Sequence, residues 1–246
     1  MGTPSADEYY QRVTEQRPSR PGTADFYAAN RGGGMLTMLD QHGGAVFASL
    51  AWRLGLKPTH LTLLNLLLGL AASAGVIAYI PAAQEGAPWW PVALAALVLW
   101  KIAYMLDCAD GQLARVTKTG SDAGARVDIL CDVAIQASVV AVVVAVADAY
   151  TPSVPAWVGG AFAALWMTNL VTSVMAKEDT SVSLVTSTGL VVRLVKLVRD
   201  YGFIVIVIAL ALLWPAAMAA VMLFFGMVNA LFLLASIAAA SRVTLR

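Results

Sequence analysis

Long apolar stretches recur along the chain, and they constrain its fold more than any other feature. A helix needs about 20 mostly apolar residues to cross the hydrocarbon core of a membrane. Such stretches occupy residues 59–80, 90–107, 122–147, 154–175 and 203–243. The last one is long enough for two crossings and contains Trp214-Pro215, where a helix would be interrupted. The sequence therefore predicts an all-α integral membrane protein with six transmembrane helices within residues 57–246.

Two more polar segments precede the predicted spans. Residues 1–34 contain several prolines, scattered charges and a run of three glycines, which favours a weakly structured cytosolic segment. Residues 35–56 mix apolar residues with polar ones such as Asp40 and Arg53, and they are too polar to cross a membrane. We expect an interfacial amphipathic helix over residues 35–56; a buried helix of the soluble type is the alternative.

The distribution of charge supports this interpretation. Only 13% of the residues are charged, against roughly 25% in soluble domains. The net charge is +1 and the chain has no long basic run, which excludes nucleic acid as a partner. Instead, the expected partners are membrane lipids.

The positions of the lysines and arginines predict how the chain is oriented. With residue 1 in the cytosol, every basic residue except Lys101 falls inside or at the inner boundary, and the expected outer loops at 81–88, 148–153 and around Pro215 contain none. This asymmetry follows the positive-inside rule and predicts a multi-pass protein of the cell's inner membrane. Lys101 lies within a span, and it either snorkels to the inner surface, the default interpretation, or pairs with a carboxylate.

Four aspartates lie at the cytosolic ends of the second and third predicted spans. Asp107 and Asp110 are three residues apart and Asp128 and Asp132 are four apart, so each pair falls on one face of a helix. Carboxylates beside hydrocarbon repel one another and lose hydration, and divalent cations relieve both penalties. The spacing predicts a metal site facing the cytoplasm, with a solvated polar patch as the alternative. Small residues stand among the acids at Gly111, Ala114 and Gly124.

Residues 107–132 match the pattern D-x-x-D-G-x-x-A-R-x8-G-x-x-x-D-x-x-x-D at every fixed position. This pattern resembles the signature of the CDP-alcohol phosphotransferases, integral membrane enzymes of phospholipid synthesis. The resemblance implies transfer of a substituted phosphoryl group from a CDP-alcohol to a hydroxyl acceptor, with release of CMP. It also implies two bound Mg²⁺ or Mn²⁺ ions and a homodimer. By the same resemblance Asp107, Asp110 and Asp128 are metal ligands, and Asp132 is the general base and an additional metal ligand.

Other residues of this segment are candidates for binding the CDP-alcohol. The small residues would let a nucleotide approach the backbone, although close helix packing explains them too. A planar guanidinium suits a phosphate, and the alternative is an ordinary arginine at the inner interface. Residues 112–121 are expected to form a loop that adds phosphate contacts from Ser121 and Lys118. The candidates with the acids are Gly111, Ala114, Arg115, Ser121 and Gly124.

A shorter element at the start of the first span, Lys-Pro-Thr-His-Leu-Thr at residues 57–62, is similar to another family motif. Pro58 suits the first turn of a helix. Thr59 stands where the family often has asparagine or aspartate, whereas Thr62 fits the motif. We expect Thr62 to contact the nucleotide, and Thr59 either to contact it or to cap the helix.

Basic residues near the inner ends of the later spans are candidates for binding the acceptor. They either bind a phosphorylated alcohol, such as an inositol phosphate, or are ordinary positive-inside residues. CDP-diacylglycerol is the expected donor, because the site would open at the depth of the lipid headgroups. One alternative is a soluble CDP-alcohol with a lipid alcohol as acceptor; another is a small cation transporter, with acids near the bilayer midplane. The basic candidates are Lys177, Arg193, Lys196, Arg199 and Arg242.

Overall fold

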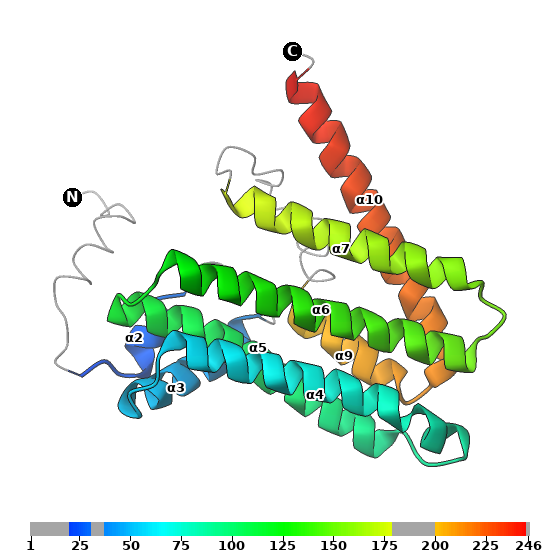
Figure 1. The fold of residues 1–246 in the computed structure, drawn as a ribbon, viewed down its shortest axis with the longest axis horizontal. Coiled ribbons are helices and arrows are strands. Elements are labelled where there is room, and N and C mark those ends of the chain that lie inside the picture. The colour runs from blue at the N-terminus through cyan, green and yellow to red at the C-terminus, as the bar shows by residue number, and fades with distance from the viewer. Residues whose placement is uncertain (1–19, 31–36, 179–199, 245–246) are drawn as a thin grey trace, which may run out of the picture.

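The computed structural model describes residues 20–30, 37–178 and 200–244, and every regular element in these ranges is helical (Figure 1). The prediction of an all-helical fold is confirmed for this part of the chain. The helices are α2 (Thr23–Ala28), α3 (Thr37–Arg53), α4 (Pro58–Gln84), α5 (Trp90–Thr117), α6 (Asp122–Tyr150), α7 (Ala156–Glu178), α9 (Tyr201–Ala211), the short 3-10 helix η1 (Pro215–Ala217) and α10 (Met218–Thr244).

Four helical segments are long and apolar enough to cross a membrane: α4, α5, α6, and a stretch that runs from η1 into α10, Pro215–Ala238. The protein is therefore a multi-pass membrane protein. Shorter apolar stretches occur in α7 and in α9, at Ala156–Thr172 and Tyr201–Ala211. Six crossings thus stay a prediction, in which these two shorter helices would supply the remaining ones.

The interruption predicted at Trp214-Pro215 is confirmed. Helix α9 ends at Ala211, and the chain turns through η1 before α10 begins at Met218. Proline has no N–H for an α-helical hydrogen bond and its ring obstructs the preceding turn, so the long apolar segment forms two helices rather than one.

Helix α4 packs against both α5 and α6 and links them through polar side chains in the core. Ser73 of α4 accepts a hydrogen bond from Trp100 Nε1 of α5 at 3.2 Å and another from the Ser138 hydroxyl of α6 at 2.9 Å. Trp100 is fully buried, and so is Val139 of α6. Hydrogen bonds between helices are stabilising where water is absent, so this core fixes the relative positions of the helices that carry the aspartates.

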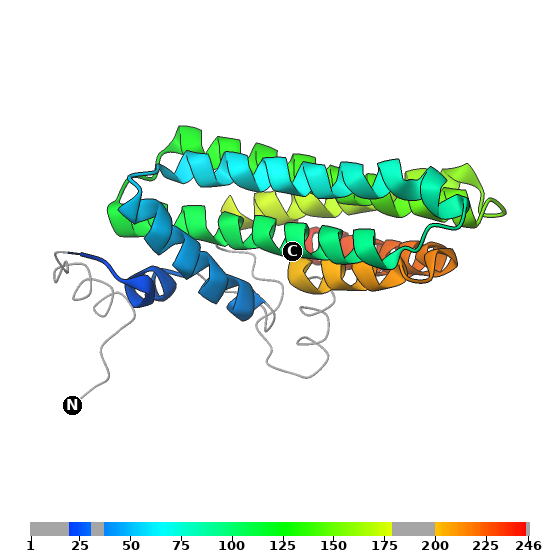
Figure 2. The ribbon, with the colours of Figure 1, turned by 90° about the horizontal axis from the view of Figure 1, so that it is seen from below.

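Helix α3 packs across α5 (Figure 2), and the residues that it buries are small or polar. A Cβ atom on Gly44 would lie 2.8 Å from Cys108 Cβ and 2.9 Å from the Met105 carbonyl oxygen, so only glycine allows this approach. The outward face carries Leu39 and Val46, which are 66% and 57% exposed. An apolar outward face is the arrangement expected of a helix that meets lipid. The interfacial location of this helix stays a prediction.

The expected loop at residues 112–121 is wrong in its extent, because α5 continues to Thr117. Residues 112–117 contain no proline and include good helix formers, so the helix continues past Gly111. It ends in a left-handed residue, Lys118, with φ 55°. The Thr119 N–H donates to the Ala114 carbonyl at 3.0 Å and closes the turn. The connection to α6 is therefore short and ordered.

The structure describes residues 20–30 of the N-terminal segment, and this part contains a short helix; the weak structure expected of residues 1–34 as a whole stays a prediction. Residues 23–28 form α2, with the Gly22 N–H donating to the Asp25 carboxylate at 2.7 Å. Phe26 is fully buried in a cluster that includes Ala48 of α3 and Leu113 of α5. Burial of this aromatic side chain explains why a short helix forms in a segment rich in loop-forming residues.

Candidate metal and substrate site

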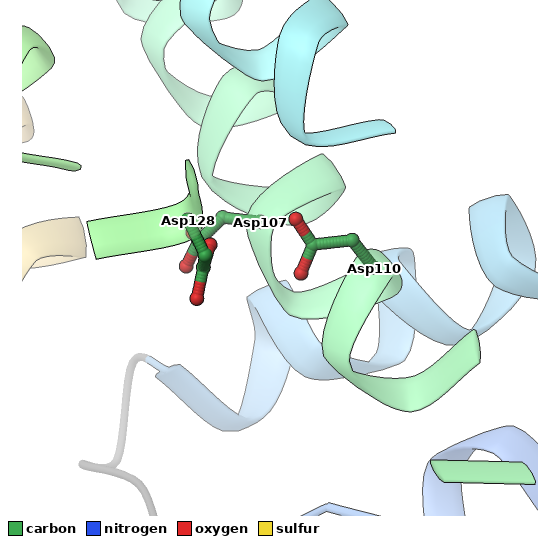
Figure 3. Close-up of side chains that lie close together, drawn as sticks. All are labelled: Asp107, Asp110 and Asp128. Carbon is green, nitrogen blue, oxygen red and sulfur yellow. The ribbon is translucent and has the colours of Figure 1, made fainter. Parts of the chain in front are cut away.

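Three of the four aspartates converge between α5 and α6. One carboxylate oxygen from each of Asp107, Asp110 and Asp128 lies within 4.8 Å of the others (Figure 3). Asp107 and Asp110 share a face of α5, and Asp128 stands on the second turn of α6. Asp110 is 6% exposed, so bulk water screens its charge only weakly. The arrangement offers several carboxylate oxygens to a single small volume.

Asp132 lies beside this group rather than within it. It is one turn further along α6 than Asp128, and its side chain is within hydrogen-bonding reach of Asp107. The carboxylate is therefore next to the converging oxygens but is not one of them. A carboxylate in this position can receive a proton from a group held by the other three.

A threonine from a third helix contacts the acids. The Thr62 hydroxyl of α4 donates to Asp110 Oδ2 at 2.5 Å, and its longer contact is to the Pro58 carbonyl at 3.3 Å. Thr62 is 4% exposed. Its hydroxyl orients the Asp110 carboxylate. A contact of Thr62 with a nucleotide stays a prediction.

Thr59 is exposed and stands at the second residue of α4. The residue that caps the helix is Lys57, whose N–H donates to His60 Nδ1 at 3.0 Å. The interpretation of Thr59 as the cap is therefore wrong. The histidine ring takes the place of the usual side-chain acceptor at the start of the helix. Histidine is rare in this position, so this hydrogen bond was not predicted from the sequence.

Arg115 folds back over Gly111. A Cβ atom at position 111 would lie 3.0 Å and 3.1 Å from the two terminal nitrogens of Arg115, so the glycine leaves room for the guanidinium. Arg115 Nε also donates to the Ala29 carbonyl, which ends α2, at 2.7 Å. This local packing explains the glycine without a nucleotide, and the arginine remains exposed at the surface.

The other small residues of the segment also have local explanations. Ser121 caps α6, and its hydroxyl accepts from the Gly124 N–H at 3.1 Å. A Cβ atom on Gly124 would lie 3.2 Å from that hydroxyl oxygen. Ala114 is half-buried on α5. Contacts of Ser121, Gly124 and Ala114 with a substrate stay a prediction.

Of the acceptor candidates, Lys177 belongs to the last turn of α7 and Arg242 to the last turn of α10. Arg193, Lys196 and Arg199 lie outside the described residues. Binding of an acceptor by any of them stays a prediction.

A second group of acidic residues lies where α3, α5 and α9 meet. Lys101 Nζ of α5 donates to Asp40 Oδ2 of α3 at 2.6 Å, so the default interpretation that Lys101 snorkels is wrong. Burial raises the pKa of Asp40, and the hydrogen bond from Lys101 opposes that shift. Asp200 caps α9 by accepting from the Phe203 N–H at 3.3 Å, and it also accepts from the Thr37 hydroxyl at 2.6 Å. Each carboxylate of this group has a donor.

Gln112 occupies a variable position of the signature, and its contacts were not predicted from the sequence. Its side chain is fully buried and donates to Asn30 Oδ1 at 2.7 Å and to the Gln41 carbonyl at 3.0 Å. An amide inside an otherwise apolar or acidic helix is a signal for such a contact, because a buried amide needs partners. Gln112 and Arg115 together tie the N-terminal segment to α5.

Apolar helices with carboxylates brought together at their ends define the class of the protein as a multi-pass membrane protein with an acidic cluster, and ionisable groups in such a place favour a functional site. More specifically, the chain belongs to the CDP-alcohol phosphatidyltransferase family, whose model matches residues 56–238. The resemblance seen at residues 107–132 is thereby confirmed. Cholinephosphotransferase 1 of Xenopus laevis is 38% identical over 79 residues, which are 32% of this chain and 19% of that protein. The human protein of the same name is 39% identical over 79 residues, with the same shares.

Proposed function

We propose that the protein is a divalent-metal-dependent CDP-alcohol phosphotransferase of phospholipid biosynthesis. It would transfer a substituted phosphoryl group from a CDP-alcohol to a hydroxyl acceptor and release CMP. The observation that carries this proposal is the convergence of Asp107, Asp110 and Asp128, in a chain of this family, at the ends of two apolar helices.

The residues at this site fit a divalent cation. Mg²⁺ and Mn²⁺ prefer carboxylate oxygens, and three of these lie within 4.8 Å of one another. Without a cation the three negative charges repel one another in a poorly hydrated place. Two bound cations would neutralise the diphosphate and stabilise the departing CMP oxygen.

The chain's own groups would orient the substrates and accept the proton. Thr62 fixes the Asp110 carboxylate, and the exposed Arg115 is our proposed partner for a phosphate. The acceptor oxygen forms a bond to phosphorus, the bond from phosphorus to CMP breaks, and Asp132 accepts the hydroxyl proton. Its position beside the converging oxygens supports this role.

We propose CDP-diacylglycerol as the donor, because the acids lie near the end of a membrane-spanning helix and thus close to the lipid headgroups. A second candidate is a soluble CDP-alcohol with a lipid alcohol as acceptor. The names of the relatives favour this candidate, since they are cholinephosphotransferases.

The test is CMP release by the purified protein with Mg²⁺ or Mn²⁺. One reaction contains CDP-diacylglycerol with an alcohol such as inositol phosphate, and the other contains CDP-choline with diacylglycerol. We expect CMP release with one donor class and its loss with a chelator. If neither donor released CMP, the proposed enzymatic activity would be refuted. Cation flux into vesicles containing the protein would then support a transporter.

We further propose that the acids face the cytoplasm at the inner membrane and that the protein is a homodimer. Single cysteines placed in a background without Cys108 and Cys131, which are free thiols, test the orientation. Positions 86 and 152 should react with an impermeant reagent from outside, and positions 118 and 177 should not. Outside labelling at position 118 would reverse the topology. Light scattering of the detergent-solubilised protein measures the oligomeric state.

A further inference from the structure

Two tyrosines in contact at the junction of α5 and α9 differ in the hydrogen bonding of their hydroxyls. The rings of Tyr104 and Tyr201 meet edge to face, with centroids 5.1 Å apart. The Tyr104 hydroxyl lies 3.2 Å from Thr37 Oγ1. The Tyr201 hydroxyl is buried and has no hydrogen-bond partner among the residues that the structure describes. A buried hydroxyl without a partner has lost its hydration without compensation, so its retention calls for an explanation.

The position of Tyr201 near the converging aspartates offers an explanation for its buried hydroxyl. Tyr201 lies within electrostatic range of Asp107 and Asp132. Asp132 is the proposed base, so the attacking hydroxyl of the acceptor has to stand within hydrogen-bonding reach of this carboxylate. Helix α9 packs on the same side of α5 as α3 does (Figure 2), and its first residue, Tyr201, meets Tyr104, which is three residues before Asp107 on α5.

Both chain neighbours of Tyr201 are fixed by the second acidic group. Asp200 caps α9 and accepts from Thr37. Gly202 lies so close to this group that a Cβ atom would be 2.8 Å from Asp40 Oδ2 and 3.3 Å from Lys101 Nζ. The backbone on both sides of the tyrosine is thus fixed, by the hydrogen bonds of Asp200 on one side and by the close packing of Gly202 against Asp40 and Lys101 on the other, and a side chain that binds a ligand needs such support.

We propose that the Tyr201 hydroxyl binds the attacking hydroxyl of the acceptor alcohol, and that Asp40, Lys101 and Asp200 hold it in place. This inference rests on the proposed function. The phenol O–H donates to the acceptor oxygen, which leaves the acceptor's own proton directed to Asp132 and a lone pair directed to phosphorus. The acceptor would supply the partner that this hydroxyl lacks.

The test compares Tyr201→Phe with Tyr104→Phe, which removes the hydroxyl of the other ring in the same pair. CMP release is measured against the concentration of each acceptor, using inositol phosphate with CDP-diacylglycerol and diacylglycerol with CDP-choline. We expect Tyr201→Phe to raise the KM for the acceptor about tenfold, the effect of one neutral hydrogen bond, with the KM for the CDP-alcohol unchanged. Tyr104→Phe should leave both KM values unchanged.

Thermal unfolding separates a binding role from a structural one. Tyr201→Phe removes a hydroxyl without a partner and should not lower the unfolding midpoint, whereas Tyr104→Phe removes a hydrogen bond and should lower it. If the wild type releases CMP but Tyr201→Phe has the same kinetics, this inference alone is wrong. It is also wrong if Tyr201→Phe has a clearly lower unfolding midpoint. A wild-type protein that releases no CMP from either donor would overturn the proposed function, and this inference with it.

Discussion

Helix α5 carries buried charge at two places less than two turns apart, and the surroundings of that charge differ. At Lys101 the ammonium faces Asp40, which is fully buried and comes from α3. At Asp107 and Asp110 the nearby charges include other carboxylates, Asp128 and Asp132 from α6. The first arrangement neutralises its own charge, whereas the second concentrates charge of one sign.

This difference separates a structural group from the proposed cation site. Each charge of a buried ion pair has its partner in the folded chain. Removing either partner therefore destabilises the fold. A set of converging carboxylates is satisfied only when a cation binds, so removal of one of them relieves repulsion in the empty protein. The comparison predicts opposite effects of Asp→Asn changes on stability at the two places.

The largest effect is expected for Asp107→Asn and Asp110→Asn. An amide keeps the shape of the side chain and loses the charge that holds a cation, so CMP release should fall to background. In a chelator the thermal unfolding midpoint of either variant should equal or exceed that of the wild type. Asp148→Asn, which alters an exposed aspartate at the other end of α6, is the matched control. If either variant released CMP at the wild-type rate and with the wild-type metal dependence, the aspartate that it replaces would not be a metal ligand.

Asp132→Asn should reduce transfer by about two to four orders of magnitude, the usual contribution of a positioned base. Binding of the CDP-alcohol should remain largely intact, because the other three carboxylates are unchanged. The comparison is made at saturating Mn²⁺ or Mg²⁺, since Asp132 is also a proposed metal ligand. Recovery of full activity at high cation would show that this carboxylate only binds metal.

Asp40→Asn tests the paired group. It leaves the Lys101 ammonium without its carboxylate and should destabilise the protein by about 3 kcal/mol, the usual effect of breaking a buried pair. Thermal unfolding in detergent measures the change, again beside Asp148→Asn. A double variant, Asp40→Leu with Lys101→Met, should recover most of the loss because no charge is left unpaired. An Asp40→Asn protein as stable as the wild type would show that the pair contributes nothing.

The smallest effect is expected for Thr62→Val, which removes the hydroxyl bonded to Asp110 and preserves the shape of the side chain. Loss of a group that orients a metal ligand typically weakens metal affinity about 10- to 100-fold. The concentration of Mn²⁺ that gives half-maximal CMP release measures this change. An unchanged metal requirement would mean that the Thr62 hydrogen bond has no role in the site.

The sequence predicted the parts of the molecule that depend on local spacing. The apolar stretches give the main helices, Trp214-Pro215 gives the break before α10, and the offsets among the aspartates place each pair on one helix face. The partner of Lys101 was not predictable, because Asp40 is 61 residues away and no local pattern connects the two. The bond from Thr62 to Asp110 spans 48 residues and depends in the same way on how α4 packs on α5.

Other differences arose where several local effects compete. Gly111 suggests an early end to α5, but the helix continues because the glycine accommodates Arg115 within the same helix. Tyr201 stands two residues before the apolar stretch at 203–243, and no motif in the sequence distinguishes it from the other aromatic residues of the chain. Its distinction becomes visible only when α9 is placed beside α5.

The pairing of Asp40 with Lys101 has a consequence for how the protein is made. Asp40 leaves the ribosome 61 residues before Lys101, and Asp200 follows much later. Helix α3 is therefore synthesised with a carboxylate whose partner does not yet exist, and we expect it to stay at the membrane surface until α5 has entered. Lys101 enters as a charge within an apolar helix, and docking of α3 neutralises it. Early assembly of this membrane protein is thus expected to be the joining of α3 to α5, completed when α9 arrives with Asp200.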